Sequence, residues 1–203
     1  MKKYLDNAMT FSEYVSLIDR LLAEGKTTGT NQSEAMLGYG RINRQRMSRL
    51  DKTLLVDEDV RESISQNTRR QTWLILTEGW CGDAAQNIPA IEKTAAASDL
   101  IETRYILRDE NFELIDAYLT DGARSIPKLI ALDPETLAVL FTWGARPRAA
   151  QAIFKQRKAE GIAKPLITEE LQRWYNADHG LSVQRELAAL VTATNTTAAA
   201  ATN

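Results

Sequence analysis

The fold of this chain is decided by residues 71–84, which read QTWLILTEGWCGDA. The stretch opens with a continuous apolar run, which is typical of a buried central strand. Gly79 and Gly82 then predict a sharp turn around Cys81. Behind the turn, apolar residues recur at the spacing of one helix face to about residue 98. The unit is therefore a strand, a turn and a helix.

Downstream of this unit, the pattern predicts a small mixed sheet and further helices. Asp133-Pro134-Glu135 separates two strands and predicts a hairpin, which would add an antiparallel edge to the sheet. The expected elements are, in order, a strand at 101–107, a helix at 110–119, strands at 128–132 and 137–143, and helices at 147–160 and 168–191. Residues 192–203 are only Thr, Ala and Asn, and they are expected to form a flexible tail.

Upstream of the unit, the sequence predicts helices only. Thr10 and Glu13 have the spacing of a capping box, and the helix that they open is expected to end at Gly25. A second helix is expected from Ser33, and a third, short one over residues 57–66. The fold class is accordingly α/β, a central mixed sheet flanked by helices, with a helical N-terminal extension.

Composition excludes several classes of protein. The chain has 203 residues, 44% of them hydrophobic, and a formal net charge of -2, which argues against a nucleic-acid binder that depends on phosphate attraction. No run approaches the ~20 apolar residues of a membrane span, so no membrane partner is expected. One cysteine allows neither an internal disulfide nor a zinc site built on several cysteines. We therefore expect a cytoplasmic protein without a metal or other cofactor.

Cys81 is the residue that could carry chemistry. A thiol at the N-terminus of a helix faces unpaired amides and the positive end of the helix dipole, both of which favour the thiolate. Trp80 can shield one side of the sulfur and offer a flat surface to a partner. A lone cysteine is more often a small buried hydrophobe, but the polar, turn-forming neighbours Gly79, Gly82 and Asp83 are not typical of core packing.

Two motifs resemble the thioredoxin family. Trp80-Cys81-Gly82 matches the start of its Trp-Cys-Gly-Pro-Cys signature, and Ser125-Ile126-Pro127 matches the cis-proline that opens a later strand. The resemblance covers roughly residues 65–160 and is strongest to divergent bacterial members with a helical extension. It implies that Cys81 is the attacking thiol and that Trp80, Gly82, Asp83, Ile126 and Pro127 contact the substrate.

The resemblance also implies a division of the chain. Residues 1–191 would form one domain, composed of the helical extension (1–66), the thioredoxin-like core (67–160) and an extra C-terminal helix (161–191).

The chain departs from the family at the reacting positions. Ala84 replaces the resolving cysteine, so the dithiol cycle is impossible within this chain. Asp83 replaces the proline of the family signature. Its negative charge would oppose a thiolate at Cys81, and a second interpretation is that Asp83 simply caps the helix. Glu78 and Lys93 are expected on the solvated surface, and His179, the single histidine, at a helix end.

Three functions follow from these residues. The leading hypothesis is a monothiol redox protein, in which Cys81 forms mixed disulfides with protein or low-molecular-weight thiols and an external thiol resolves them. The alternative is a redox-inactive module that binds peptides between Trp80 and Pro127. The third is a carrier of a metal or cluster that resembles the monothiol glutaredoxins, and it fits worst because Asp83 and Ala84 differ from the motif of those proteins. The sequence leaves the oligomeric state, the partner and the resolving thiol open.

Overall fold

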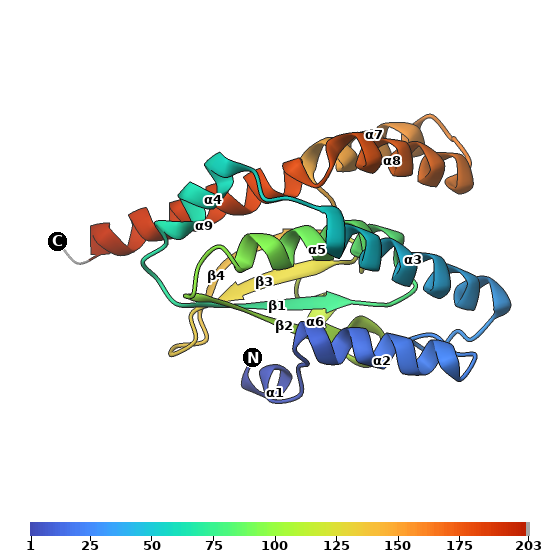
Figure 1. Ribbon diagram of the computed structural model, residues 1–203, viewed down its shortest axis with the longest axis horizontal. Coiled ribbons are helices and arrows are strands. Elements are labelled where there is room, and N and C mark those ends of the chain that lie inside the picture. Colours follow the sequence, from blue (N-terminus) through green and yellow to red (C-terminus); the bar gives the residue numbers. More distant parts are fainter. Residues whose placement is uncertain (202–203) are drawn as a thin grey trace.

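The computed structural model describes the backbone of residues 1–201 and the side chains of residues 1–196. Its centre is a four-stranded mixed sheet (Figure 1) in the order β2-β1-β3-β4. The strands are β1 (Gln71–Thr77), β2 (Ile101–Leu107), β3 (Lys128–Leu132) and β4 (Val139–Gly144). β1 pairs parallel with β2 and antiparallel with β3, and β4 completes the antiparallel hairpin.

The central position of β1 follows from its sequence. Every residue of β1 is buried, as expected of a strand covered on both faces. Its register places Ile75 opposite Tyr105 of β2 and Leu129 of β3. The predicted mixed sheet with a central strand at this position is confirmed.

Helices cover both faces of the sheet (Figure 1), with α5 and α3 on one side and α2 on the other. On the α2 side, Tyr14 stacks on Tyr105 with ring centroids 5.2 Å apart, and its hydroxyl lies 3.2 Å from Thr77 Oγ1. The helices are α1 (Lys2–Leu5), α2 (Phe11–Ala23), α3 (Glu34–Thr53), α4 (Glu58–Ser65), α5 (Gly82–Ala95), α6 (Phe112–Asp116), α7 (Arg148–Ala159), α8 (Lys164–Asp178) and α9 (Leu181–Ala201). The predicted capping box at Thr10 and Glu13 is confirmed.

The C-terminal region differs from the prediction in two respects. The single helix expected over residues 168–191 is two helices, because His179 adopts a left-handed conformation (φ 52°) and ends α8. A Cβ at the next residue, Gly180, would lie 2.8 Å from Leu54 Cδ1, so close packing also favours the break. The last helix also continues past residue 191, since α9 extends to Ala201 through the segment expected to be a tail, while residues 202 and 203 lie outside the described part of the chain.

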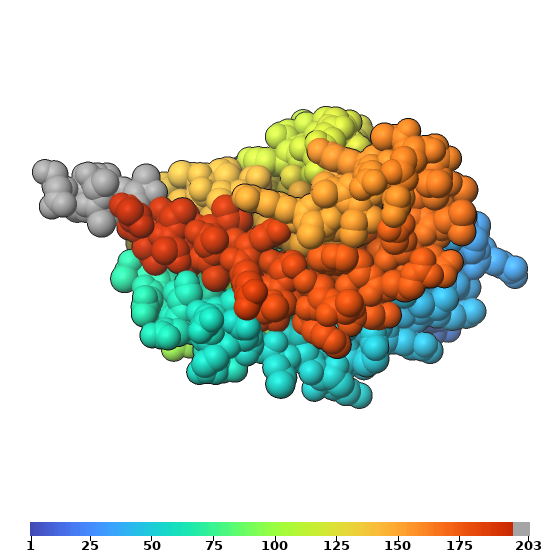
Figure 2. Space-filling model, turned by 90° about the horizontal axis from the view of Figure 1, so that it is seen from above, coloured from blue at the N-terminus to red at the C-terminus, as the bar shows by residue number. Residues whose placement is uncertain are grey.

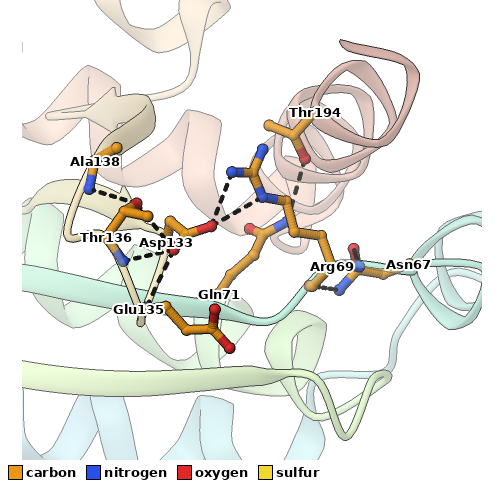
Figure 3. Close-up of polar contacts among 8 residues, drawn as sticks. All are labelled: Asn67, Arg69, Gln71, Asp133, Glu135, Thr136, Ala138 and Thr194. Atoms are coloured by element: carbon orange, nitrogen blue, oxygen red, sulfur yellow. Dashed lines mark hydrogen bonds and ion pairs between the residues drawn. The ribbon is translucent and has the colours of Figure 1, made fainter. Parts of the chain in front are cut away.

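Polar contacts hold α9 and the β3–β4 turn at the end of the sheet where β1 begins (Figure 3). Arg69 pairs with Asp133 at 2.8 Å, and the backbone N–H of Thr136 donates to the same carboxylate. These hydrogen bonds hold the pKa of Asp133 below its usual range. Gln71 of β1 reaches the hydroxyl of Thr194, which is buried, and this contact gives the last helix a fixed place against the sheet.

The helix expected over residues 110–119 is also shorter than predicted. A single 3-10 turn (Arg108–Glu110) precedes it, and α6 itself covers Phe112–Asp116. Among the described residues, no helix has both the length and the hydropathy that a membrane crossing requires.

Candidate functional site

Cys81 lies in the turn between β1 and α5. Its N–H donates to the carbonyl of Glu78 at 3.1 Å, which closes the turn. Cys81 is the N-cap residue of α5, and its Sγ accepts a hydrogen bond from the N–H of Ala84 at 3.4 Å. The sulfur therefore takes the place of the capping oxygen that a serine or aspartate would supply, and it satisfies one free amide of the helix start.

The loop before β3 lies against this sulfur. The Cys81 thiol donates to the carbonyl of Ile126 at 3.3 Å, and the Ile126–Pro127 peptide bond is cis. The prediction that the cysteine turn and the proline loop meet in space is confirmed by this contact. In the described part of the chain, the N–H of Ile126 donates to no recorded acceptor. Two of the sequence-predicted site segments, more than 40 residues apart, are thus brought together.

Trp80, the residue before Cys81, is held by contacts with α3 and with the end of β2. Asn43 of α3 donates from Nδ2 to the carbonyl of Trp80 at 2.8 Å. The guanidinium of Arg108, just after β2, lies over the indole ring at 4.9 Å from its centroid. The Trp80 side chain is partly exposed, so it is packed on one part of its surface and accessible on another. The helical extension and the end of β2 together hold Trp80 in place.

Asp83 is engaged in an ion pair and does not cap the helix. Its Oδ2 lies 2.6 Å from Arg146 Nη2, and its Oδ1 accepts a hydrogen bond from the Tyr175 hydroxyl at 2.9 Å. Both charged side chains are less than one-sixth exposed. The interpretation of Asp83 as a helix cap is therefore wrong: the N-cap is Cys81, and the Asp83 carboxylate turns away from the first amides toward α8 and the loop before α7.

The α7–α8 hairpin packs against the start of α5 through polar contacts. Gln172 accepts a hydrogen bond from Gln86 at 2.8 Å, and Asn87 donates to the Tyr175 hydroxyl at 3.2 Å. The hairpin has a small apolar cluster of its own, separate from the main core, composed of Ala150, Ile167, Leu171 and Tyr175. Figure 2 shows α7, α8 and α9 as an orange-to-red band across this face. The seam between the hairpin and α5 is therefore made of hydrogen-bonded polar side chains, of which Gln86 and Asn87 are buried, rather than of apolar core residues.

The environment of Cys81 favours the thiol over the thiolate. The residue is only 8% exposed. Burial raises the pKa of the Cys81 thiol to about 12, and the negative charge of Asp83 adds to this, while the Ala84 and Asp83 amides and Arg146 oppose it. The sequence-based expectation that the helix start would favour the thiolate is outweighed by desolvation.

Glu78 was expected on the surface, and this expectation is wrong, because its side chain is fully buried. It follows the buried strand β1 directly, so it lies under the loop of residues 27–29. Glu78 Oε1 accepts a hydrogen bond from the N–H of Asp109 at 2.8 Å, and Oε2 has no partner among the described atoms. Burial raises the pKa of Glu78 to about 7, and the hydrogen bond from the Asp109 N–H opposes the rise. Its place directly after a strand with the apolar run of residues 73–76 was the available signal.

The raised pKa of Glu78 predicts a pH-dependent stability. The folded state keeps a proton that the unfolded state loses at its ordinary pKa of 4.5, so the free energy of unfolding falls as pH rises from about 4.5 through 7, by up to about 3 kcal/mol. Glu78→Gln should remove this loss and stabilise the protein by about 2 kcal/mol at pH ~8, with little effect at pH ~5. Urea unfolding at several pH values measures the difference.

The matched control is Glu62→Gln, at an exposed carboxylate of α4, which should leave the pH dependence as in the unsubstituted protein. Parallel pH curves for the Glu78 variant and the unsubstituted protein would contradict the assignment of a neutral carboxyl at this site.

Among the described residues, no group of three or more His, Cys, Asp or Glu side chains could hold a metal ion. His179 ends α8, as predicted, and lies away from the cysteine turn.

Comparisons with known proteins concern most of the chain. A family model described as "Thioredoxin" matches residues 29–160. No curated protein matches the chain. The crystal structure of a protein of unknown function from Pseudomonas aeruginosa is similar, with a TM-score of 0.61, 18% identity, and coverage of 93% of this chain and 94% of that one. An HIV epitope-scaffold crystal structure has a TM-score of 0.54 and 18% identity, covering 90% and 98%. At this identity, the two structures are evidence for the fold alone.

Proposed function

The chain belongs to the thioredoxin family, and from this premise we propose that it is a monothiol redox protein in which Cys81 forms mixed disulfides that an external thiol resolves. The observation that carries the proposal is the position of the sulfur, held between the Ala84 amide of a helix start and the Ile126 carbonyl. An attacking sulfur needs donors that stabilise its negative charge, and the first amides of α5 supply them.

The proline loop supports the same function. An extended peptide that lay along this loop could accept a hydrogen bond from the free Ile126 N–H and donate to the Ile126 carbonyl once the thiol released it. The partner's sulfur would then be held next to Cys81. Trp80 and Pro127 would flank this peptide and Gly82 would lie next to it, whereas the Asp83 carboxylate, paired with Arg146, would face away from it.

The reaction has two steps that balance. The Cys81 thiol first loses its proton to water. The resulting thiolate attacks one sulfur of a disulfide, and the new bond between the two sulfurs forms as the old disulfide bond breaks. The leaving sulfur departs with the electron pair as a thiolate. A second, external thiolate then attacks the mixed disulfide, which restores the Cys81 thiolate and releases a new disulfide. The external thiol is required because Ala84 offers no second sulfur.

The closed structure is the resting form in this proposal. With a pKa of about 12, roughly one Cys81 thiol in 10⁵ is ionised at neutral pH, so the resting protein would react slowly. Displacement of the α7–α8 hairpin would admit water to Cys81 and lower the free energy needed to ionise the thiol. The polar seam at Asp83, Gln86 and Asn87 would make that movement less costly than opening a hydrophobic core.

The test is the formation and release of a mixed disulfide. We expect hydroxyethyl disulfide to add one hydroxyethylthio group per chain, at Cys81, and dithiothreitol to remove it, both followed by intact-protein mass spectrometry. Cys81→Ser should show no adduct. A folded protein that gives no adduct over hours, including at alkaline pH, would contradict the proposal.

Asp83→Asn is predicted to make Cys81 more reactive. The change removes the neighbouring negative charge and leaves the positive charge of Arg146 beside the sulfur, so the pKa of Cys81 should fall. A fall of about one unit would raise the rate of alkylation by iodoacetamide at neutral pH about tenfold. Loss of the buried ion pair should also lower the free energy of unfolding by about 3 kcal/mol.

Asp99→Asn, in an exposed loop, serves as the control and should alter neither quantity. Equal alkylation rates for the Asp83 variant and the unsubstituted protein, both folded, would favour the second candidate function. That candidate is a redox-inactive module that binds peptides beside Trp80 and Pro127. The observation in its favour is the burial of Cys81 with its proton held on the Ile126 carbonyl.

A further inference from the structure

Arg46 of α3 lies over the cysteine turn. A Cβ atom placed on Gly82 would be 3.9 Å from Arg46 Nη1, and equally far from Asn43 Oδ1 and Gln172 Nε2. Arg46 donates from Nη1 to Asn43 Oδ1 at 2.5 Å, and Asn43 in turn donates to the carbonyl of Trp80. The guanidinium is therefore tied to the backbone of the turn that carries Cys81.

The charge of Arg46 is not neutralised by an ion pair. The other two guanidiniums at the turn are each paired, Arg146 with Asp83 at 2.6 Å and Arg108 with Asp109 at 2.6 Å. Among the described side chains, Arg46 makes no ion pair, and its recorded hydrogen bond is to Asn43. Among the described residues, the turn therefore carries one positive charge without an ion-pair partner, on a guanidinium whose five donors allow further hydrogen bonds.

Burial makes this spare charge costly. Arg46 is half-buried, and burial together with the nearby Arg49 lowers its pKa, while the negative charge of Asp83 opposes the shift. Arg49 also lines a shallow cleft of about 400 Å³ on α3, with Arg44 and Lys52. An anion at Arg46 would relieve both the desolvation and the repulsion between these cations.

We propose that Arg46 selects anionic partners for Cys81, namely disulfides and thiols that carry a carboxylate close to the sulfur. The inference rests on the monothiol function proposed above and names the substrate class of the same site. A guanidinium binds a carboxylate through two parallel hydrogen bonds, which fixes orientation as well as charge. With the carboxylate beside Gly82, the substrate's sulfur would lie toward Cys81, the preceding residue.

The experiment compares two small disulfides. Dithiodiglycolate, the disulfide of thioglycolate, carries a carboxylate one carbon from each sulfur, and hydroxyethyl disulfide is neutral. The rate of mixed-disulfide formation at Cys81 is measured for each by mass spectrometry, and the ratio of the two rates is the readout, because it cancels general changes in access to the sulfur. Arg46→Gln should lower this ratio about tenfold relative to the unsubstituted protein.

Two further variants make the test specific. Arg46→Lys keeps the charge but not the two parallel hydrogen bonds, so it should retain part of the ratio and lie between Arg46→Gln and the unsubstituted protein, which a pure packing role would not produce. Arg20→Gln, at an exposed arginine of α2, is the matched control and should leave the ratio as it was. Raising the salt concentration should lower the ratio in the unsubstituted protein and have less effect in Arg46→Gln.

The outcomes are distinguishable. An unchanged ratio in Arg46→Gln, with adducts forming from both disulfides, would overturn the anion preference and leave the monothiol function standing. No adduct from either disulfide in a folded protein would overturn the monothiol function and the anion preference together.

Discussion

Gly144→Ala is expected to lower the free energy of unfolding by about 4 kcal/mol and to disturb the site. Gly144 ends β4 at φ +114°, where residues with a side chain are strained, and its Cβ would lie 2.2 Å from the carbonyl oxygen of Pro127. Because the obstacle is backbone, relief requires the loop that touches Cys81 to move. We therefore expect faster alkylation of Cys81 as well, measured with iodoacetamide alongside chemical unfolding.

Gly122→Ala separates these effects from the general cost of replacing a glycine. Gly122 also has a positive φ (+74°), but no atom lies within 4 Å of its Cβ position. Its replacement should cost about 1 kcal/mol and leave the reactivity of Cys81 unaltered. Similar losses of unfolding free energy in the two variants would show that the contact with Pro127 does not contribute to the effect.

Ala84→Cys is expected to convert the chain into a dithiol reductase. Without added thiol, the unsubstituted protein should stop after one mixed disulfide, so its turnover of insulin disulfides should be undetectable. Ala84 is at the N3 position and its amide reaches Cys81 Sγ, so a thiol there lies one helical turn from the attacking sulfur. With reductant supplied by thioredoxin reductase and no added small thiol, the variant should be at least about a hundredfold faster than the unsubstituted protein, because the second attack becomes intramolecular.

Ala85→Cys is the matched control, since Ala85 is equally buried but points to another side of α5. It should give no turnover, and Cys81→Ser in the Ala84→Cys background should abolish any gain. A folded Ala84→Cys protein without turnover would mean that the closed hairpin or Asp83 keeps the turn from reacting, which would favour the peptide-binding alternative.

The frame of the site follows from short-range patterns in the sequence. The apolar run over residues 71–77 has only one favourable place, the middle of a sheet, and the glycines after it allow a tight turn into a helix. That order alone puts Cys81 at a helix start. Local patterns of this kind depend on neighbours within a few residues, so the strands, the capping box at Thr10 and the lack of a resolving thiol could all be predicted.

The tertiary structure alone decided the electrostatics of the site. Asp83 has its partners in Arg146 and Tyr175, and Glu78 is covered by the loop around Thr28, all distant along the chain. No local sequence pattern indicates such contacts. The protonation state of an ionisable side chain, and the free energy that its burial costs, depend on the residues that pack against it. For the same reason Cys81 is protonated here, although a helix start in isolation favours the thiolate. The sequence predicted the helices that bury Cys81, but it did not indicate where they would lie.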